Sequence, residues 1–189
     1  MSSHEDLRVI ALAEFARAGY TGTSLQRIAE IAGLSKSSVL YHYSSKEALL
    51  EAAIGPAVDR AAVVLGSIGG ALVDADARQR FVVAFSDFLL EHRLEVHMFV
   101  NQGTSLEDVP IVQRANAIIA ELAGYFATNA TTYEDKMRFA VALGGTAYML
   151  ARESHYPDAV VASTEETRAA LITILTELLS PVPVRTTTP

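Results

Sequence analysis

Between residues 35 and 42 the sequence SKSSVLYH concentrates hydroxyl, ammonium, phenol and imidazole groups, with no acidic side chain among them. Groups of these kinds donate hydrogen bonds to phosphate oxygens and to acceptor atoms on base edges. Val39 is the residue of this stretch that we expect to face inward. The pattern therefore predicts a short helix whose outer surface approaches a nucleic acid.

The residues before this stretch predict the structure that holds it. Thr23 and Gln26 have the spacing of a capping box, so a short helix should start after Thr23. Gly33 stands where a helix needs a left-handed residue to end, and Ser35 is a second N-cap candidate. The inward face of the first helix follows the spacing i, i+3, i+4, i+7 and comprises Leu25, Ile28, Ala29 and Ala32. Two helices joined by a glycine-containing turn form a helix-turn-helix unit.

The rest of the chain predicts more helices, no convincing strand and no repeat, so the expected fold is all-α with about nine helices. Besides the two just described, helices are expected at 5–18, about 46–65, 74–92, 94–101, 110–126, 132–152 and 164–179. Ser44 and Glu47 form a capping box, and Pro56 predicts a kink or break near Ile54. Residues 67–70 and 155–158 are expected to be loops.

Composition limits the possible functions. The chain has 189 residues, half of them hydrophobic, and its net charge is −7. Residues 1–50 hold five basic and five acidic side chains, so this negative charge lies entirely beyond residue 50. The absence of cysteine excludes disulfides, thiolate zinc sites and cysteine nucleophiles. The first residues contain no apolar leader, and no uncharged run approaches the ~18–20 residues that span a bilayer. We therefore expect a cytoplasmic protein.

The first 50 residues resemble the TetR family of bacterial transcriptional regulators. The agreement covers, in one register, Phe15, Gly19-Tyr20, Thr23-Ser24, Ile28-Ala29, Ala32 to Lys36, Leu40 to Tyr43 and Lys46 to Leu49. The resemblance implies a homodimer that binds a near-palindromic operator and is released by a small effector. It implies a DNA-binding domain at 1–50 and an effector-binding and dimerisation domain at 51–180. The Pro- and Thr-rich residues 181–189 are expected to form a disordered tail.

The expected DNA contacts lie in the helix-turn-helix unit and at the start of the following helix. They are Thr23, Ser24, Arg27, Ser35, Lys36, Ser37, Ser38, Tyr41, His42 and Lys46. Lys36 could contact a guanine edge or a phosphate, and Arg27 could contact a phosphate or simply face solvent. Thr23 could serve as a cap alone, and His42 as a capping or core residue.

The C-terminal part offers an effector pocket and a dimer interface. The candidate pocket residues are Phe85, Phe88, His97, Met98, Asn101, Tyr125 and Tyr148, a mostly apolar set with a few polar anchors. Each of them could instead be ordinary core. The helices at 132–152 and 164–179 could form a four-helix interface with a second copy, where the small residues 144–147 would allow close approach. Those residues could equally pack inside one protomer.

Two other functions are compatible with a helical bundle. One is an enzyme or cofactor-binding protein that uses its last helices to dimerise, and the other is a DNA-binding structural protein without an effector. No nucleophile elbow, P-loop or dinucleotide-binding glycine pattern supports catalysis. His92 and His97 are five residues apart, a poor fit to one helix face, so we expect neither a metal site nor a cofactor. The sequence does not identify the effector, the operator or the regulated genes.

Overall fold

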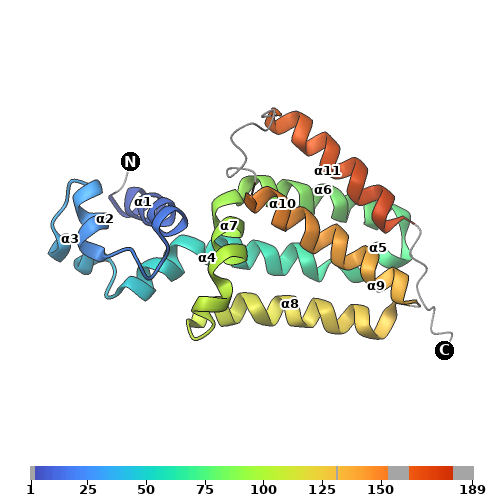
Figure 1. Ribbon diagram of the computed structural model, residues 1–189, viewed down its shortest axis with the longest axis horizontal. Helices are drawn as coiled ribbons and strands as arrows, with labels where there is room; N and C mark the ends of the chain where they lie inside the picture. The colour runs from blue at the N-terminus through green and yellow to red at the C-terminus, as the bar shows by residue number, and fades with distance from the viewer. Residues whose placement is uncertain (1–2, 131, 153–161, 181–189) are drawn as a thin grey trace. The chain divides into compact units, whose positions relative to one another are not determined.

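The computed structural model describes residues 3–130, 132–152 and 162–180, which form helices and no strand (Figure 1). The helices are α1 (Ser3–Ala18), α2 (Leu25–Ile31), α3 (Lys36–His42), α4 (Lys46–Gly66), α5 (Ile68–Val73), α6 (Ala75–Glu91), α7 (Arg93–Gln102), η1 (Gly103–Leu106), α8 (Pro110–Asn129), α9 (Tyr133–Phe139), η2 (Ala140–Gly145), α10 (Thr146–Arg152) and α11 (Thr164–Leu179). The predicted all-α fold, with a helix-turn-helix domain ahead of a larger helical part, is confirmed. Within the described residues, no helix is both long enough and apolar enough to cross a membrane.

The chain divides into two compact units. The first combines Met1–Asp59 with Leu94–Ala115, and the second combines Arg60–Arg93 with Asn116–Pro189. Residues from the middle of the chain therefore pack with the N-terminal helices. The boundary expected at residue 50 separates a DNA-binding part from an effector-binding part. Compact packing units do not test such a functional boundary, so it stays a prediction.

The core of the first unit is built from one apolar stripe of each N-terminal helix. Leu7 and Phe15 of α1, Ile28 of α2, Val39 of α3 and Leu49 of α4 are all fully buried. The α3 helix contributes Val39 as its only buried residue, so most of its surface faces outward. This arrangement is what the short apolar pattern of residues 35–42 predicts.

The second unit is organised around α6, which packs against α5 and α11. α11 also packs against α9 and the η2 segment, and these helices appear together in the orange and red part of Figure 1. The large buried side chains of this unit include Phe81, Phe85, Leu89, Phe126, Phe139, Leu171, Leu175 and Leu179. An aromatic and leucine core of this kind is what the spacing in 74–92 and 164–179 predicts.

Pro56 lies inside α4, which continues without a break, so the break expected near Ile54 is absent and the alternative of a kink stays a prediction. Two other expectations about local structure are wrong. The loop expected at 67–70 is instead helical from Ile68, because Ile68 and Ala71 are buried and this packing outweighs the weak helix propensity of the two glycines. The start of α4 is capped by Ser45, whose hydroxyl accepts from the Ala48 amide, rather than by Ser44.

The helix expected at 132–152 is present but not uniform. Thr132 and Asp135 form a capping box at its start. Over Ala140–Gly145 it widens into a π-helix between α9 and α10. The last helix is also capped by a box, formed by Ser163 and Glu166. The loop expected at 155–158 and the tail at 181–189 lie outside the described residues.

Candidate nucleic-acid interface

The turn between α2 and α3 is fixed by hydrogen bonds within the chain. The Leu34 amide donates to the Ala29 carbonyl at 2.9 Å, and the Gly33 amide donates to the Glu30 carbonyl at 3.2 Å. This pair of bonds is the Schellman pattern that ends a helix. Gly33 has a φ of +67°, a conformation that favours glycine. The turn therefore ends α2 at the residue that the sequence indicates.

Ser35 caps the recognition helix α3. Its hydroxyl accepts from the Ser38 amide at 3.1 Å and lies 2.9 Å from the Ser37 hydroxyl and 2.8 Å from the Ser38 hydroxyl. A helix of seven residues has few internal bonds, so a cap contributes a large share of its local stability. The predicted capping role of Ser35 is confirmed.

Replacing Ser35 with Ala should lower the free energy of unfolding by about 1 kcal/mol, because the Ser38 amide loses its partner. Urea denaturation followed by circular dichroism measures this. Ser37→Ala is the matched control, since it removes an exposed serine hydroxyl from the same helix without removing the cap. Equal stability of the two variants would contradict the capping role.

The outer face of α3 is cationic and polar. Lys36, Ser37 and Tyr41 are exposed, and Tyr41 retains 87% of its accessible surface. The Tyr41 ring meets the half-buried His42 edge-on, with 5.4 Å between centroids. Because Lys36, Ser37 and Tyr41 are exposed, a nucleic acid could reach these predicted contact residues. Whether each meets a base or a phosphate stays a prediction.

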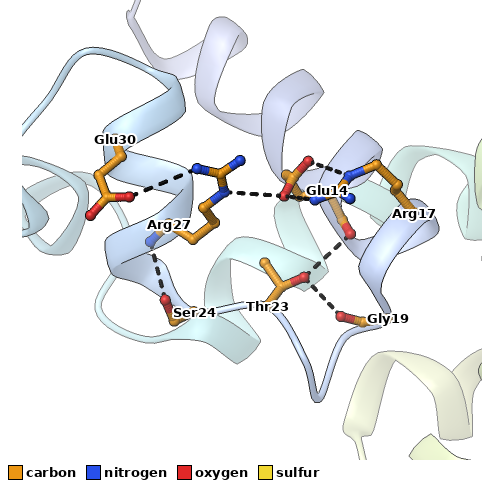
Figure 2. Close-up of polar contacts among 7 residues, drawn as sticks. All are labelled: Glu14, Arg17, Gly19, Thr23, Ser24, Arg27 and Glu30. Atoms are coloured by element: carbon orange, nitrogen blue, oxygen red, sulfur yellow. Dashed lines mark hydrogen bonds and ion pairs between the residues drawn. The ribbon is translucent and has the colours of Figure 1, made fainter.

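Thr23 differs from its expected role. Ser24, not Thr23, is the N-cap of α2, and its hydroxyl accepts from the Arg27 amide at 3.1 Å. Thr23 is 3% exposed, and its hydroxyl faces the carbonyl oxygens of Gly19 at 2.8 Å and Glu14 at 3.3 Å (Figure 2). Its hydroxyl is thus committed to the end of α1, which argues against a phosphate contact.

Arg27 lies between two carboxylates, as Figure 2 shows. Its guanidinium is 3.8 Å from Glu14 and 3.9 Å from Glu30, distances of loose ion pairs. Glu14 is held more tightly by Arg17, which donates to it at 2.9 and 2.8 Å. Those hydrogen bonds lower the pKa of Glu14, with smaller contributions from the charges of Arg17 and Arg27. Arg27 remains half exposed, so its expected phosphate contact stays a prediction.

Lys46 also differs from its expected role. Its ammonium group donates to the carbonyl oxygens of Tyr20 at 2.7 Å and Thr23 at 2.8 Å. It also lies 4.2 Å from the centroid of the Tyr20 ring. Burial lowers the pKa of Lys46. Its ammonium group therefore stabilises the connection between α1 and α2, and the expected phosphate contact stays a prediction.

The residues predicted for an effector pocket are divided between the two compact units. Phe85 and Phe88 are buried on α6 in a run of stacked rings, and Met98 is 2% exposed in the first unit. The Asn101 amide donates to the backbone carbonyl of His97 at 2.8 Å, so this polar pair is satisfied internally. The remaining two residues belong to the second unit, Tyr125 half-buried and Tyr148 53% exposed.

The second unit also carries a groove of about 530 Å³. It is lined by Arg60, Asp76, Gln79, Arg80, Val83, Ala84 and Asp87, none of which was predicted as a pocket residue. Beside it, Arg168 of α11 donates two hydrogen bonds to Asp87 of α6, which lower the pKa of Asp87. Among the residues that the structure describes, no group of three or more potential ligands could hold a metal ion.

The geometry of α2, the turn and α3 is that of a helix-turn-helix unit, the arrangement in which DNA-binding proteins place their second helix in the major groove. Residues 9–53 match the family model for bacterial regulatory proteins of the tetR family. Over 49 residues the chain is 47% identical to the HTH-type transcriptional regulator RutR of Escherichia coli K12, a match covering 26% of this chain and 23% of RutR. The matched part is thus less than a quarter of that relative.

Solved structures extend the likeness to the rest of the fold. The ketosteroid transcriptional regulator KstR2 of Mycobacterium tuberculosis has a TM-score of 0.67 at 15% identity, over 96% of this chain and 95% of that chain. A TetR-like transcriptional regulator from Rhodococcus sp. RHA1 has a TM-score of 0.62 at 20% identity, over 94% and 96%. The match to the TetR family therefore covers the N-terminal helix-turn-helix part of this chain.

Proposed function

We propose that this protein represses transcription by binding an operator as a homodimer, and that a small, largely apolar effector releases it. The observation that carries the proposal is the outer face of α3, which is exposed and contains no acidic residue. Val39 is the only buried residue of this short helix, so most of its surface is left for the major groove. The net negative charge of the chain lies beyond residue 50, away from this face in sequence.

The proposed DNA contacts are the predicted residues that lie on α2 or α3 or cap the N-termini of these two helices. They are Ser24, Arg27, Ser35, Lys36, Ser37, Ser38, Tyr41 and His42. Thr23 and Lys46 are left out, because their polar groups bond to the connection between α1 and α2. Serines at the start of α3 let the backbone come close to the duplex, while Lys36 supplies charge.

An exposed apolar face supports the proposed dimer. Along α9, η2 and α10 it comprises Tyr133, Met137, Val141, Tyr148 and Met149, each between 47% and 78% exposed. Gly144 and Gly145 are exposed on the same stretch, whereas Thr146 is buried inside the protomer. Ile174 is a further exposed apolar residue, on α11, which packs against α9 and η2. Two copies joined here would form a four-helix interface, with recognition helices roughly 34–36 Å apart.

The effector is proposed to bind in the second unit. Phe85, Phe88 and Tyr125 belong to that unit and offer aromatic surface with one phenol hydroxyl, a make-up suited to an apolar ligand. Such a ligand would weaken operator binding in proportion to its preference for the conformation that does not fit DNA. Native mass spectrometry of the purified protein, before and after denaturation, would detect a ligand retained from the expression host.

The DNA-binding proposal is tested with operators selected from a random DNA pool. Lys36→Ala should weaken binding to the selected operator by at least about tenfold, because each dimer loses two cationic contacts. If Lys36 meets a phosphate, the slope of log affinity against log salt concentration should fall by roughly two. If Lys36 meets a guanine, the loss should instead be reproduced by 7-deazaguanine at that base. Mobility-shift titration measures both. Tyr41→Ala should also weaken binding.

Arg80→Ala is the matched control for charge, since Arg80 is 73% exposed and lies on α6. It should leave operator affinity unchanged. The proposal fails if the wild-type protein selects no sequence from the pool, or if Lys36→Ala and Tyr41→Ala both bind with wild-type affinity.

A further inference from the structure

The end of α1 is closed by a side chain that lies more than eighty residues away in the sequence. The Gln102 amide nitrogen donates to the Phe15 carbonyl at 2.8 Å, and the Gln102 amide oxygen accepts from the Tyr20 amide at 2.8 Å. Phe15 is among the last four residues of α1, whose carbonyl oxygens have no partner within the helix. The side-chain amide of Gln102 thus supplies a partner both to the Phe15 carbonyl, which has none within the helix, and to the Tyr20 amide just after the helix.

This task requires the chemistry of glutamine. Its amide is a donor at one end and an acceptor at the other, and both ends are used here. Glutamate would keep only the acceptor, and methionine would keep the shape but neither function. Gly19 has a φ of +80°, so the chain turns sharply between the two bonded residues and presents them to the same amide.

The connection that Gln102 holds is also held from α4. Lys46 donates to the carbonyl oxygens of Tyr20 and Thr23, and the Thr23 hydroxyl donates back to Gly19. Residues 19–23 are therefore bonded to the last residue of α7 and the first residue of α4. Directly after them comes Ser24, the cap of α2. The position of α2, and through the turn that of α3, follows from where this connection is held.

We propose that Gln102 is a positioning residue for operator binding, which it serves by holding the α1–α2 connection so that α3 is presented in one orientation. This inference rests on the proposed function. It extends the DNA-binding part beyond residues 1–50, in agreement with the packing of 94–115 in the same compact unit. Loss of the amide would leave α3 folded but free to adopt more than one orientation, and the binding-competent fraction would fall.

The test compares Gln102→Met and Gln102→Glu with the wild type, and uses Gln113→Met as control because Gln113 is an exposed glutamine on α8. Operator affinity is measured well below the melting temperature, and the active fraction is measured separately by stoichiometric titration. Gln102→Met should weaken the apparent affinity by roughly fivefold or more, because that affinity scales with the share of molecules in the binding-competent orientation at any moment. The active fraction, which counts the molecules able to bind at saturating DNA, should be unchanged. Gln102→Glu, which keeps the acceptor for the Tyr20 amide, should weaken the affinity less.

Hydrogen exchange of the Tyr20 amide, followed by nuclear magnetic resonance, reports the contact itself. In Gln102→Met this amide should exchange at least about tenfold faster, whereas in Gln113→Met it should be unchanged. A lower active fraction at wild-type affinity would indicate a purely structural role and overturn the inference, as would unchanged affinity in Gln102→Met. A wild-type protein that selects no operator would instead overturn the proposed function, while the exchange measurement would still report the contact.

Discussion

Val141→Asp is expected to convert the protein to a monomer and to lower its operator affinity by at least about a hundredfold, because two linked half-site contacts become independent. Val141 is 49% exposed and lies midway along the apolar face of α9, η2 and α10. In a symmetric dimer both copies carry the new carboxylate, so two charges would be buried near one axis without a partner. In the isolated protomer the side chain faces solvent, and folding should persist.

The control for Val141→Asp is the same substitution at Val63, a valine of α4 that is 66% exposed. Val63→Asp should remain dimeric and bind the operator normally. Sedimentation velocity gives the oligomeric state, and mobility shift gives the affinity. A Val141→Asp protein that sediments as a dimer would show that the copies associate through another surface.

Phe139→Ala should lower the free energy of unfolding by about 3–5 kcal/mol, the range measured for removing a large aromatic side chain from a core. Phe139 is 1% exposed, and its ring stacks on Phe126 of α8 with 3.9 Å between centroids. Truncation would remove the contact between α9 and α8 and leave a cavity beside the start of the proposed dimer face. Urea denaturation at a fixed protein concentration measures the change.

Tyr41→Ala is the matched control for Phe139→Ala, since it removes an aromatic ring that is 87% exposed. Its stability should stay within about 0.5 kcal/mol of the wild type. A loss below about 1 kcal/mol for Phe139→Ala would mean that neighbouring side chains refill the space, contrary to the close packing expected of a core.

Local patterns were enough to predict the helix-turn-helix unit. Gly33 ends α2 and Ser35 caps α3, both through hydrogen bonds and dihedral angles that involve only a few neighbouring residues, and the structure confirms both roles. The choice between Thr23 and Ser24 as the cap of α2 was not decided locally. Both residues have suitable hydroxyls, but Thr23 is buried against the end of α1. Its hydroxyl donates to a carbonyl oxygen there and does not cap α2.

The roles of Lys46 and Gln102 depend on contacts across long stretches of sequence. Lys46 bonds to residues 23 and 26 positions away, and Gln102 to residues 82 and 87 positions away. Sequence separations of this size leave no periodic pattern from which the contacts could be predicted. For Lys46, a cation near the start of a helix, the sequence therefore indicates only a phosphate contact. The two glycines at 69 and 70 predict a loop, but the segment is helical because Ile68 and Ala71 are buried.

The π-helical hexapeptide Ala140–Gly145 holds about one residue more than an α-helix of the same number of turns would hold. Deleting one residue there should return the segment to an ordinary α-helix, so α10 should keep nearly the same orientation relative to α9. Deleting one residue within α10 would leave no wide turn to absorb the loss, and the residues beyond the deletion would rotate by about 100°. The wide turn therefore makes this part of the helix tolerant of a one-residue change in length.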